Sequence, residues 1–368
     1  MPPHQPDHRT ALTGAALIDE LIRRKATFAA FRLPGKDALA YVQHSADLQP
    51  PHAGQQCFVL APFDTGEGPV LCIKPEMILA IDEDRSTMSG IAERTDGPEH
   101  ALFHGLDRTG YRSAVAESIN AIRAGQLQKV VLARTIATDL GHATSGSLFQ
   151  AACLAYPSAF VAMARTKRFG TWLGATPERL MSAAMNRIEV DSLAGTLPAY
   201  NAPGIAEAWG EKEREEQRLV TAEITDCLLA NGAREVHADA PTVKRSANVA
   251  HLHTRITAIA EQHDALRLAA ALHPTPAVGG KPAFEAFELI RRLEPRSRSL
   301  YAGYWGPVEA EQAQLFVNIR CMEIAGPRAL LHVGAGITGS SDPEVECDEV
   351  ELKARTWLNL IEELGARR

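Results

Sequence analysis

The chain has 368 residues, of which 45% are hydrophobic and 23% charged, and its formal net charge is −7. This composition is typical of a soluble globular protein, and no apolar run reaches the roughly 18 residues that a membrane span needs. The acidic balance, without basic clusters, argues against a nucleic-acid partner. The polar beginning, MPPHQPDHRT, lacks the features of a signal peptide, so we expect a cytoplasmic protein whose six cysteines are reduced.

The first half of the chain predicts a helix, a group of strands and then single long helices between further strands. A helix is expected in ALTGAALIDELIRRK, and strands are expected in TFAAFRL, ALAYVQ and QCFVLAPF. Apolar residues at helical spacing predict a helix over residues 111–124, followed by a strand over residues 126–140. Strands in SAFVAMAR, GTWLGAT and RIEVDSLAG precede a long helix from about Gly210, which Gly232 ends.

The second half repeats this organisation. A β-like run containing HLH is followed by a helix over residues 282–293 and by three strands, in LYAGYWGPV, QAQLFVNIRCMEI and RALLHVGAG. One amphipathic helix ends the chain. Because strands come in consecutive runs, the pattern favours an α+β fold with large, mostly antiparallel sheets and helices outside. No polar linker separates two parts, so one domain over residues 1–368 is expected.

The stretch LLHVGAGITGSS has the glycine spacing of a dinucleotide-binding turn, at Gly334, Gly336 and Gly339. The residues that follow hold an acidic segment and one helix, with no second strand for a βαβ unit, which argues against a dinucleotide. Two interpretations remain. The glycines form a tight turn without a ligand, or their backbone N–H groups meet a small anion, with carboxylates beyond them for a metal.

Two charged residues stand in otherwise apolar β-segments. Lys129 precedes VVLAR; it either reaches solvent from the strand end or, if partly buried, acts as a base. Glu178 lies in GATPERL, in a turn between two strands, as a solvated carboxylate or as a general acid. His251 and His253 point to one side of their strand, and we interpret them as a hydrogen-bonded structural pair, with a zinc site as the alternative.

Two helices each carry a pair of carboxylates three residues apart, and therefore on one face. Glu213 and Glu216 lie in EKEREEQRLV, and Glu346 and Glu349 lie in the last helix. Each pair is either a solvated surface balanced by nearby Lys and Arg, or part of an oxygen-rich site for a cation such as Mg²⁺.

Eight blocks of the sequence occur in the order found in the chorismate-utilising enzymes: QKVVLART, GATPERL, SLAGT, EKEREEQRLV, ALHPTPAVGGKP, LEPRSRSLYAGYWG, VNIRC and GAGITGSSDPEVECDEVELK. The resemblance covers residues 106–368, the catalytic part, while residues 1–105 form a variable N-terminal part. Within the family the chain is most similar to the isochorismate synthases. Lys129 stands where ammonia-using members have glutamine, and Ala194 stands where members that form a covalent adduct have lysine.

This resemblance implies the family's sandwich of two sheets and a reversible, Mg²⁺-dependent conversion of chorismate to isochorismate. Water would add at C2 while the C4 hydroxyl leaves, with Lys129 as the base and Glu178 as the acid. Glu216 and Glu349 would hold the metal, and Glu213 and Glu346 would hold its waters or complete the shell. The implied substrate contacts are Thr196, Thr254, His273, Ala277, Tyr301, Arg320, Gly334, Gly336 and Lys353.

Departures from the family pattern keep a second activity open. Tyr301 in LYAG, and EPRSR in place of the usual EPFDR, leave room for a salicylate synthase, which also eliminates pyruvate. A non-catalytic chorismate-binding subunit is disfavoured because every acid–base and carboxylate residue is present. The sequence contains no glutamine amidotransferase, and we expect no such partner subunit. We also expect no membrane partner, and we expect a monomer.

Overall fold

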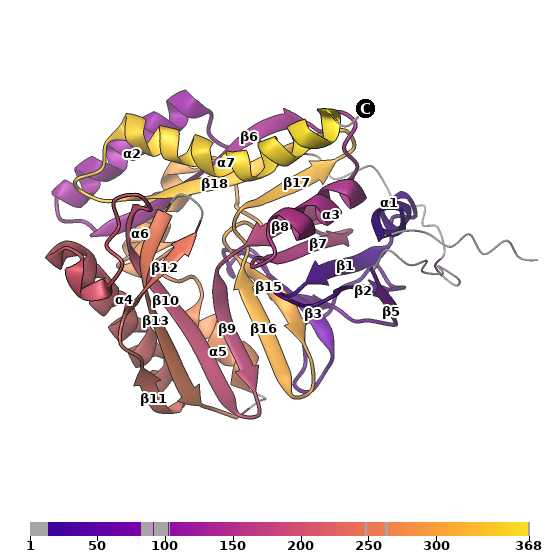
Figure 1. The fold of residues 1–368 in the computed structure, drawn as a ribbon, viewed down its shortest axis with the longest axis horizontal. Helices are drawn as coiled ribbons and strands as arrows, with labels where there is room; N and C mark the ends of the chain where they lie inside the picture. The colour runs from indigo at the N-terminus through magenta and orange to yellow at the C-terminus, as the bar shows by residue number, and fades with distance from the viewer. Residues whose placement is uncertain are drawn as a thin grey trace, which may run out of the picture.

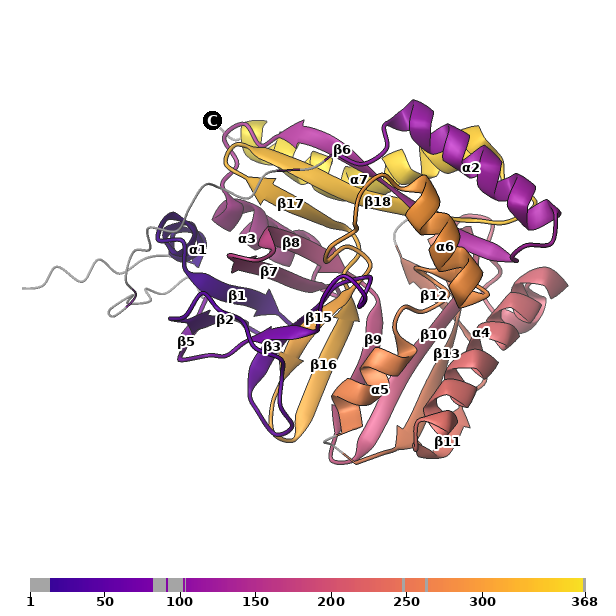
Figure 2. The same cartoon turned by 180° about the vertical axis from the view of Figure 1, so that it is seen from behind.

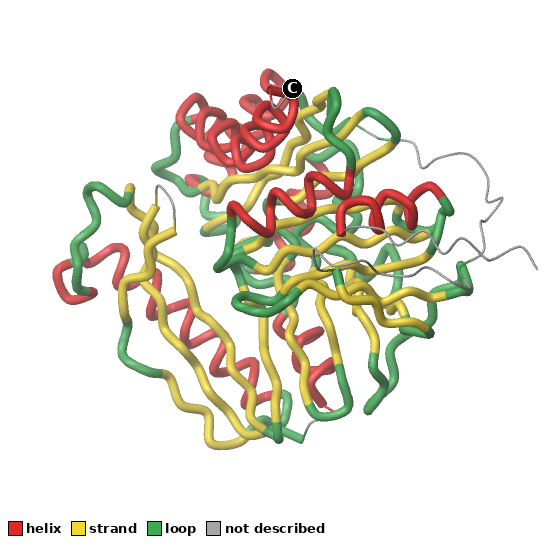
Figure 3. The backbone as a smooth tube through the Cα atoms, turned by 45° about the vertical axis from the view of Figure 1, so that its right-hand side comes forward, coloured by secondary structure: helices red, strands yellow, loops and turns green. Residues whose placement is uncertain are grey.

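The computed structural model describes residues 14–81, 91, 102, 104–246, 249–261 and 264–366. Two nine-stranded sheets form its centre, and antiparallel pairing joins neighbouring strands in both (Figure 1). The helices flank these strands (Figure 3). The predicted α+β class with large antiparallel sheets is therefore confirmed, while the limits of the domain stay a prediction.

The first sheet consists of Thr27–Arg32 (β1), Ala38–Gln43 (β2), Met77–Ala80 (β5), Lys129–Asp139 (β6), Phe160–Thr166 (β7), Gly170–Thr176 (β8), Gly280–Lys281 (β14), Cys321–Ala325 (β17) and Arg328–Ile337 (β18). Their order across the sheet is β14-β6-β18-β17-β8-β7-β1-β2-β5. β6 and β14 thus lie at one end of this sheet, and the N-terminal strands lie at the other.

The second sheet consists of Cys57–Ala61 (β3), Leu71–Ile73 (β4), Arg179–Ala184 (β9), Arg187–Pro198 (β10), Arg234–Ala238 (β11), Thr242–Ser246 (β12), Val249–Ile259 (β13), Tyr304–Val308 (β15) and Gln312–Val317 (β16). Their order is β11-β13-β10-β9-β16-β15-β3-β4, and β12 also pairs with β13. The N-terminal strands therefore extend both sheets.

The helices are Gly14–Arg23 (α1), Arg108–Arg123 (α2), Ser145–Ala155 (α3), Glu211–Ala230 (α4), Ala265–Leu272 (α5), Ala283–Leu293 (α6) and Pro343–Ala366 (α7), with a short 3₁₀ helix at Ala206–Ala208 (η1). α7 and α2 pack on β18 and β6, whereas α4 packs on β10 and β13 (Figure 2). In the described part of the chain, no helix has the length and apolar character required to cross a membrane.

Aromatic rings fill the space between the sheets at the end that carries the N-terminal strands. Phe160 of the first sheet stacks on Phe316 of the second, with ring centroids 4.2 Å apart. Phe31 of β1 likewise contacts Phe58 of β3 at 5.3 Å. Phe58 and Phe160 are fully buried. Because these rings come from both sheets, the sheets pack face to face, and their burial is a main source of stability.

One predicted strand is in fact two. QAQLFVNIRCMEI was predicted as a single strand, but it divides into β16 and β17, which belong to different sheets. The chain crosses between them at residues 318–320, and Arg320 takes a positive φ of 48° there. The Asn318 side chain donates to the Leu300 carbonyl at 2.9 Å and fixes this crossing. An apolar, strand-like run cannot show a change of sheet, because its pattern is the same on both sides of the crossing.

Candidate active site

Two glycines of β18 leave space for two predicted site residues, Lys129, the first residue of the neighbouring strand β6, and Tyr301. A Cβ atom at Gly336 would lie 3.1 Å from Lys129 Cε, and one at Gly334 would lie 2.7 Å from the Tyr301 hydroxyl oxygen. Both glycines face the same side of the strand, since they are two residues apart. The glycines therefore make room for the lysine and the tyrosine. They lie within β18 and not in a turn before a helix, which rules out the dinucleotide-binding arrangement.

Glu178 lies in the connection between β8 and β9, where backbone contacts hold it. Its carbonyl accepts from the Val317 amide at 3.1 Å, next to the crossing between the sheets. Burial raises the pKa of the Glu178 carboxyl, and the positive charges of Lys129, Lys244 and Arg320 oppose this rise. A carboxyl that keeps its proton to a higher pH than an ordinary glutamate has the property that a general acid needs.

Arg320 and His251 lie in the same charged cluster. Burial lowers the pKa of Arg320, and Glu178 is one of the groups that favour its charged form. Burial also lowers the pKa of His251 to about 4, helped by the positive charges of Arg320, Lys353 and Lys244. His251 is therefore neutral at pH 7, a polar group able to donate or accept hydrogen bonds among charges.

The structure gives a partner for one histidine of the predicted His251–His253 pair, whose role stays a prediction. The His253 Nε2 atom lies 2.9 Å from Asp191 Oδ1, so this histidine is engaged with a carboxylate of β10. The positive charges of the cluster act on the other histidine, His251, whose backbone pairs with Thr196 of the SLAGT block.

Lysines pair with two of the four predicted metal-binding carboxylates. Lys353 Nζ lies 2.8 Å from Glu349 Oε1 and donates to the Gly334 carbonyl at 2.8 Å. Lys129 Nζ lies 3.5 Å from Glu216 Oε1. The structure thus joins the two carboxylate-bearing helices, α4 and α7, to the glycine face of β18, and each carboxylate already has a cationic neighbour.

The remaining two carboxylates differ in their surroundings. Glu346 is buried; burial raises its pKa, and the nearby charge of Glu349 adds to this rise. Glu213 folds back over Gly210 at the start of α4. Among the described residues, no three His, Cys, Asp or Glu side chains converge closely enough to hold a metal ion. The donor chemistry nevertheless suits Mg²⁺, because a buried carboxyl beside a second carboxylate is relieved by a cation.

The other predicted contacts lie in several places. The His273 ring donates from Nε2 to the carbonyls of Pro62 and Phe63, and burial lowers its pKa to about 4. Among the described residues, no hydrogen bond or ion pair joins His273 to Lys129 or Glu178. Thr254 is buried opposite Ser192, whose hydroxyl contacts Thr221 of α4.

Ala277 and Thr196 are the last two predicted substrate contacts. Ala277 lies in the segment before β14 and is partly buried. The Thr196 side chain lies outside the described part of the structure, although its backbone pairs with His251. Their roles toward the substrate stay predictions.

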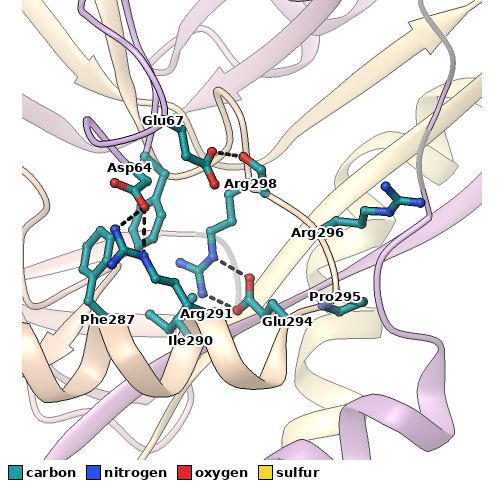
Figure 4. A pocket seen from close by; sticks show the side chains of 11 residues that line it. Asp64, Glu67, Phe287, Ile290, Arg291, Glu294, Pro295, Arg296 and Arg298 are labelled. Carbon is teal, nitrogen blue, oxygen red and sulfur yellow. Dashed lines mark hydrogen bonds and ion pairs between the residues drawn. The ribbon is translucent and has the colours of Figure 1, made fainter.

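A separate pocket of about 240 Å³ lies beside the end of α6 (Figure 4). Neither Lys129 nor Glu178 lines it. Its charged side chains are largely paired with one another: Arg291 with Asp64 at 2.6 Å, and Arg298 with Glu294 at 2.5 Å. The lining residues are Phe63, Asp64, Glu67, Phe287, Ile290, Arg291, Glu294, Pro295, Arg296, Ser297 and Arg298.

Comparison with known proteins gives a consistent result. A family model described as chorismate binding enzyme matches residues 76–362. The salicylate biosynthesis isochorismate synthase of Pseudomonas aeruginosa is 33% identical over 267 residues, which are 70% of this chain and 56% of that protein. The isochorismate synthase MenF of Escherichia coli is 32% identical over 274 residues, 70% of this chain and 62% of that protein. The chain thus covers less than two thirds of the length of both relatives.

A solved structure supports the same fold. The menaquinone-specific isochorismate synthase from Escherichia coli superposes with a TM-score of 0.75 at 23% sequence identity, covering 91% of this chain and 88% of that one. Similarity at this level of identity establishes the architecture of the two sheets and their helices.

Proposed function

Because this chain belongs to the chorismate binding enzyme family, we propose that it converts chorismate to isochorismate. The observation that carries this proposal is that Lys129 lies close enough to Glu178 for its charge to act on the carboxyl, while burial raises the pKa of that carboxyl. The names of the two relatives, both isochorismate synthases, support the same reaction. Ala194, which stands where members that form a covalent adduct have lysine, disfavours such an adduct.

In the proposed reaction, water attacks C2 of the ring while the C4 hydroxyl leaves and the double bonds shift. Lys129 accepts the proton of the attacking water, so its amine is neutral at that moment. Glu178 donates a proton to the departing hydroxyl, which leaves as water. In the reverse direction the two residues exchange roles, and one allylic hydroxyl again replaces another.

The substrate's two carboxylates need positive partners, and the cluster offers them. Arg320, at the crossing between the sheets, would bind one carboxylate, and its guanidinium can make two parallel hydrogen bonds to it. The Tyr301 hydroxyl and the backbone near Gly334 and Gly336 would approach the same group, since no Cβ atoms intervene. Lys353 would contribute the second positive charge on the glycine face.

We propose that Mg²⁺ is held by Glu216 and Glu349, with Glu346 and Glu213 supporting its waters. When bound, the ion supplies positive charge for the ring carboxylate of chorismate. Engagement of Glu216 with a metal would also remove the anion that pairs with Lys129 at 3.5 Å. The lysine would then be released to act as the base.

The proposal is tested by incubating the purified chain with chorismate and Mg²⁺ and identifying the products by chromatography. Isochorismate at equilibrium with chorismate is the expected result, and no consumption of chorismate would contradict it. A second candidate activity is salicylate formation, because Tyr301 in LYAG stands where salicylate synthases also have tyrosine. Salicylate and pyruvate, formed without a second enzyme, would identify that activity.

A further inference from the structure

Side chains, in place of a strand, complete one edge of the first sheet. β14 pairs with β6 only through its two residues, at the start of β6. Beyond it, the Arg298 Nη2 group donates to the Val131 carbonyl at 2.6 Å, and Glu294 Oε1 accepts from the Ala133 amide at 2.8 Å. The Arg298 and Glu294 side chains thus bind the backbone groups of β6 that lie just beyond its pairing with β14.

The two side chains also bind each other. Arg298 Nε donates to Glu294 Oε2 at 2.8 Å, and Nη2 lies 2.5 Å from Oε1 (Figure 4). Only 3% of the Arg298 side chain and 6% of the Glu294 side chain are exposed. A buried ion pair adds little net stability compared with apolar side chains of the same volume, because both charges lose their hydration. Stability alone therefore does not account for a pair at this place.

The pair reaches two further segments of the proposed active site. Arg298 Nη1 donates to the Val278 carbonyl at 3.0 Å, next to Ala277. The Arg298 carbonyl accepts from the Tyr301 amide at 2.9 Å, and its guanidinium lies 5.9 Å from the centre of the Tyr301 ring. Arg298 thus binds the strand that begins with Lys129 and the segment before β14 through its guanidinium, and the turn that carries Tyr301 through its carbonyl.

We propose that Glu294 and Arg298 are positioning residues that hold Lys129 and Tyr301 in register with each other. They act through backbone contacts and touch neither the proposed base nor the substrate. The statement that they position catalytic groups rests on the proposed function. Their hydrogen bonds to the edge of β6 do not depend on that function. A displacement of about 1 Å in a catalytic group can lower the rate about 10²-fold, so loosening this edge reduces turnover.

The test compares two ion pairs that line the same pocket. Glu294→Gln keeps the shape and the acceptor for Ala133 but leaves the charge of Arg298 uncompensated. The matched control is Asp64→Asn, which breaks the Asp64–Arg291 pair. In the described part of the chain, this control pair makes no hydrogen bond to β6.

Turnover of chorismate and amide hydrogen exchange in β6 are the two measurements. For folded Glu294→Gln we expect kcat to fall about 10- to 100-fold, with KM within about threefold of wild type. Exchange at residues 130–134 should be faster. Asp64→Asn should match wild type in kcat and in exchange.

A second variant covers the case in which Glu294→Gln does not fold. The double substitution Glu294→Met with Arg298→Met removes both charges, which is tolerated better than removing one. It still leaves the Val131 carbonyl and the Ala133 amide unbound, so kcat should fall and exchange should accelerate as before. Wild-type kcat and exchange in the folded double variant would overturn the proposal. Should the wild type not consume chorismate, the proposed function fails, and exchange in β6 still decides whether the pair holds this edge.

Discussion

At one end of the paired sheets, the rings of Phe58, Phe160 and Phe316 fill the space between strands, while at the other end charged and polar side chains gather around Glu178 and His251. The three rings at the aromatic end carry no ionisable group themselves. At the charged end, burial raises the pKa of Glu178 and lowers that of His251. Burying charges that are only partly paired lowers the free energy of unfolding. Well-packed apolar regions elsewhere in the fold must therefore supply the stability. The comparison predicts that activity and stability respond to different substitutions.

The largest effect is expected from Lys129→Ala at the charged end. Loss of the base should lower turnover by about 10²–10⁴-fold, while equilibrium binding of chorismate persists and the unfolding midpoint stays near that of wild type. Steady-state kinetics and calorimetric binding check this. Lys212→Ala, at an exposed position of α4, is the control. Near-normal turnover of Lys129→Ala would remove the base assignment.

Glu178→Gln should lower turnover by a similar factor, about 10²–10⁴-fold, with little change in KM, because the amide cannot deliver a proton. Burial raises the folded pKa of Glu178, so its protonated form persists to higher pH and is lost as pH rises through that value. A pH–rate series should therefore show a falling limb in the wild type. The apparent values belong to the coupled Lys129–Glu178 pair.

The pH–rate profile of Glu178→Gln tests whether Glu178 is the acid. The falling limb, caused by Glu178 losing its proton, should vanish in Glu178→Gln. Survival of this limb unchanged would show that another group is the acid.

Phe160→Ala tests the aromatic end. Removing a fully buried ring that stacks on Phe316 at 4.2 Å should lower the free energy of unfolding by about 3–5 kcal/mol. The specific activity of the folded fraction should stay within about twofold of wild type. Denaturant titration and active-site titration measure the two quantities. Leu154→Ala, a change at an exposed apolar side chain, should shift stability by less than about 0.5 kcal/mol.

Glu216→Gln and Glu349→Gln should each weaken Mg²⁺ binding at least about tenfold, since each removes a charge from a proposed ligand set. Calorimetry in the absence of substrate measures this directly. Glu362→Gln, farther along α7 and 69% exposed, is the control. Equal activity in excess chelator and in Mg²⁺ would contradict the metal proposal.

The smallest effect concerns His251. Its folded pKa of about 4 lies below the ordinary value of 6.5, so folding favours the neutral ring, and this stability is lost as pH falls through that window. Between about pH 7 and pH 5.5 the wild type should lose about 1 kcal/mol more than His251→Gln. Denaturant unfolding at the two pH values measures the difference, and His273 remains in both proteins as a constant contribution. Parallel losses in the two proteins would place His251 outside the desolvated cluster.

Much of the architecture was predictable from the sequence, because the spacing of apolar residues shows which side of a helix or strand is buried. The helix from Gly210 to its end before Gly232, for example, is α4. The short helices α3 and α5 were missed, since few turns give a weak periodic signal. In the site, Lys129 and Glu178 were identifiable as charges within apolar runs. The charged surroundings of His251 were not predictable, because Arg320, Lys353 and Lys244 come from three other segments, which only the fold brings together.

The N-terminal strands have a further consequence for how the chain is made. β1 pairs with β7, and β3, which begins at Cys57, pairs with β15, which ends at Val308. A ribosome must therefore complete most of the protein before β3 finds this partner, whereas the partner of β1 is made earlier. Contacts as distant in sequence as that of β3 slow folding and leave unpaired strand edges open to aggregation. In a nascent chain, β3 therefore stays without β15 until residues 304–308 have been synthesised.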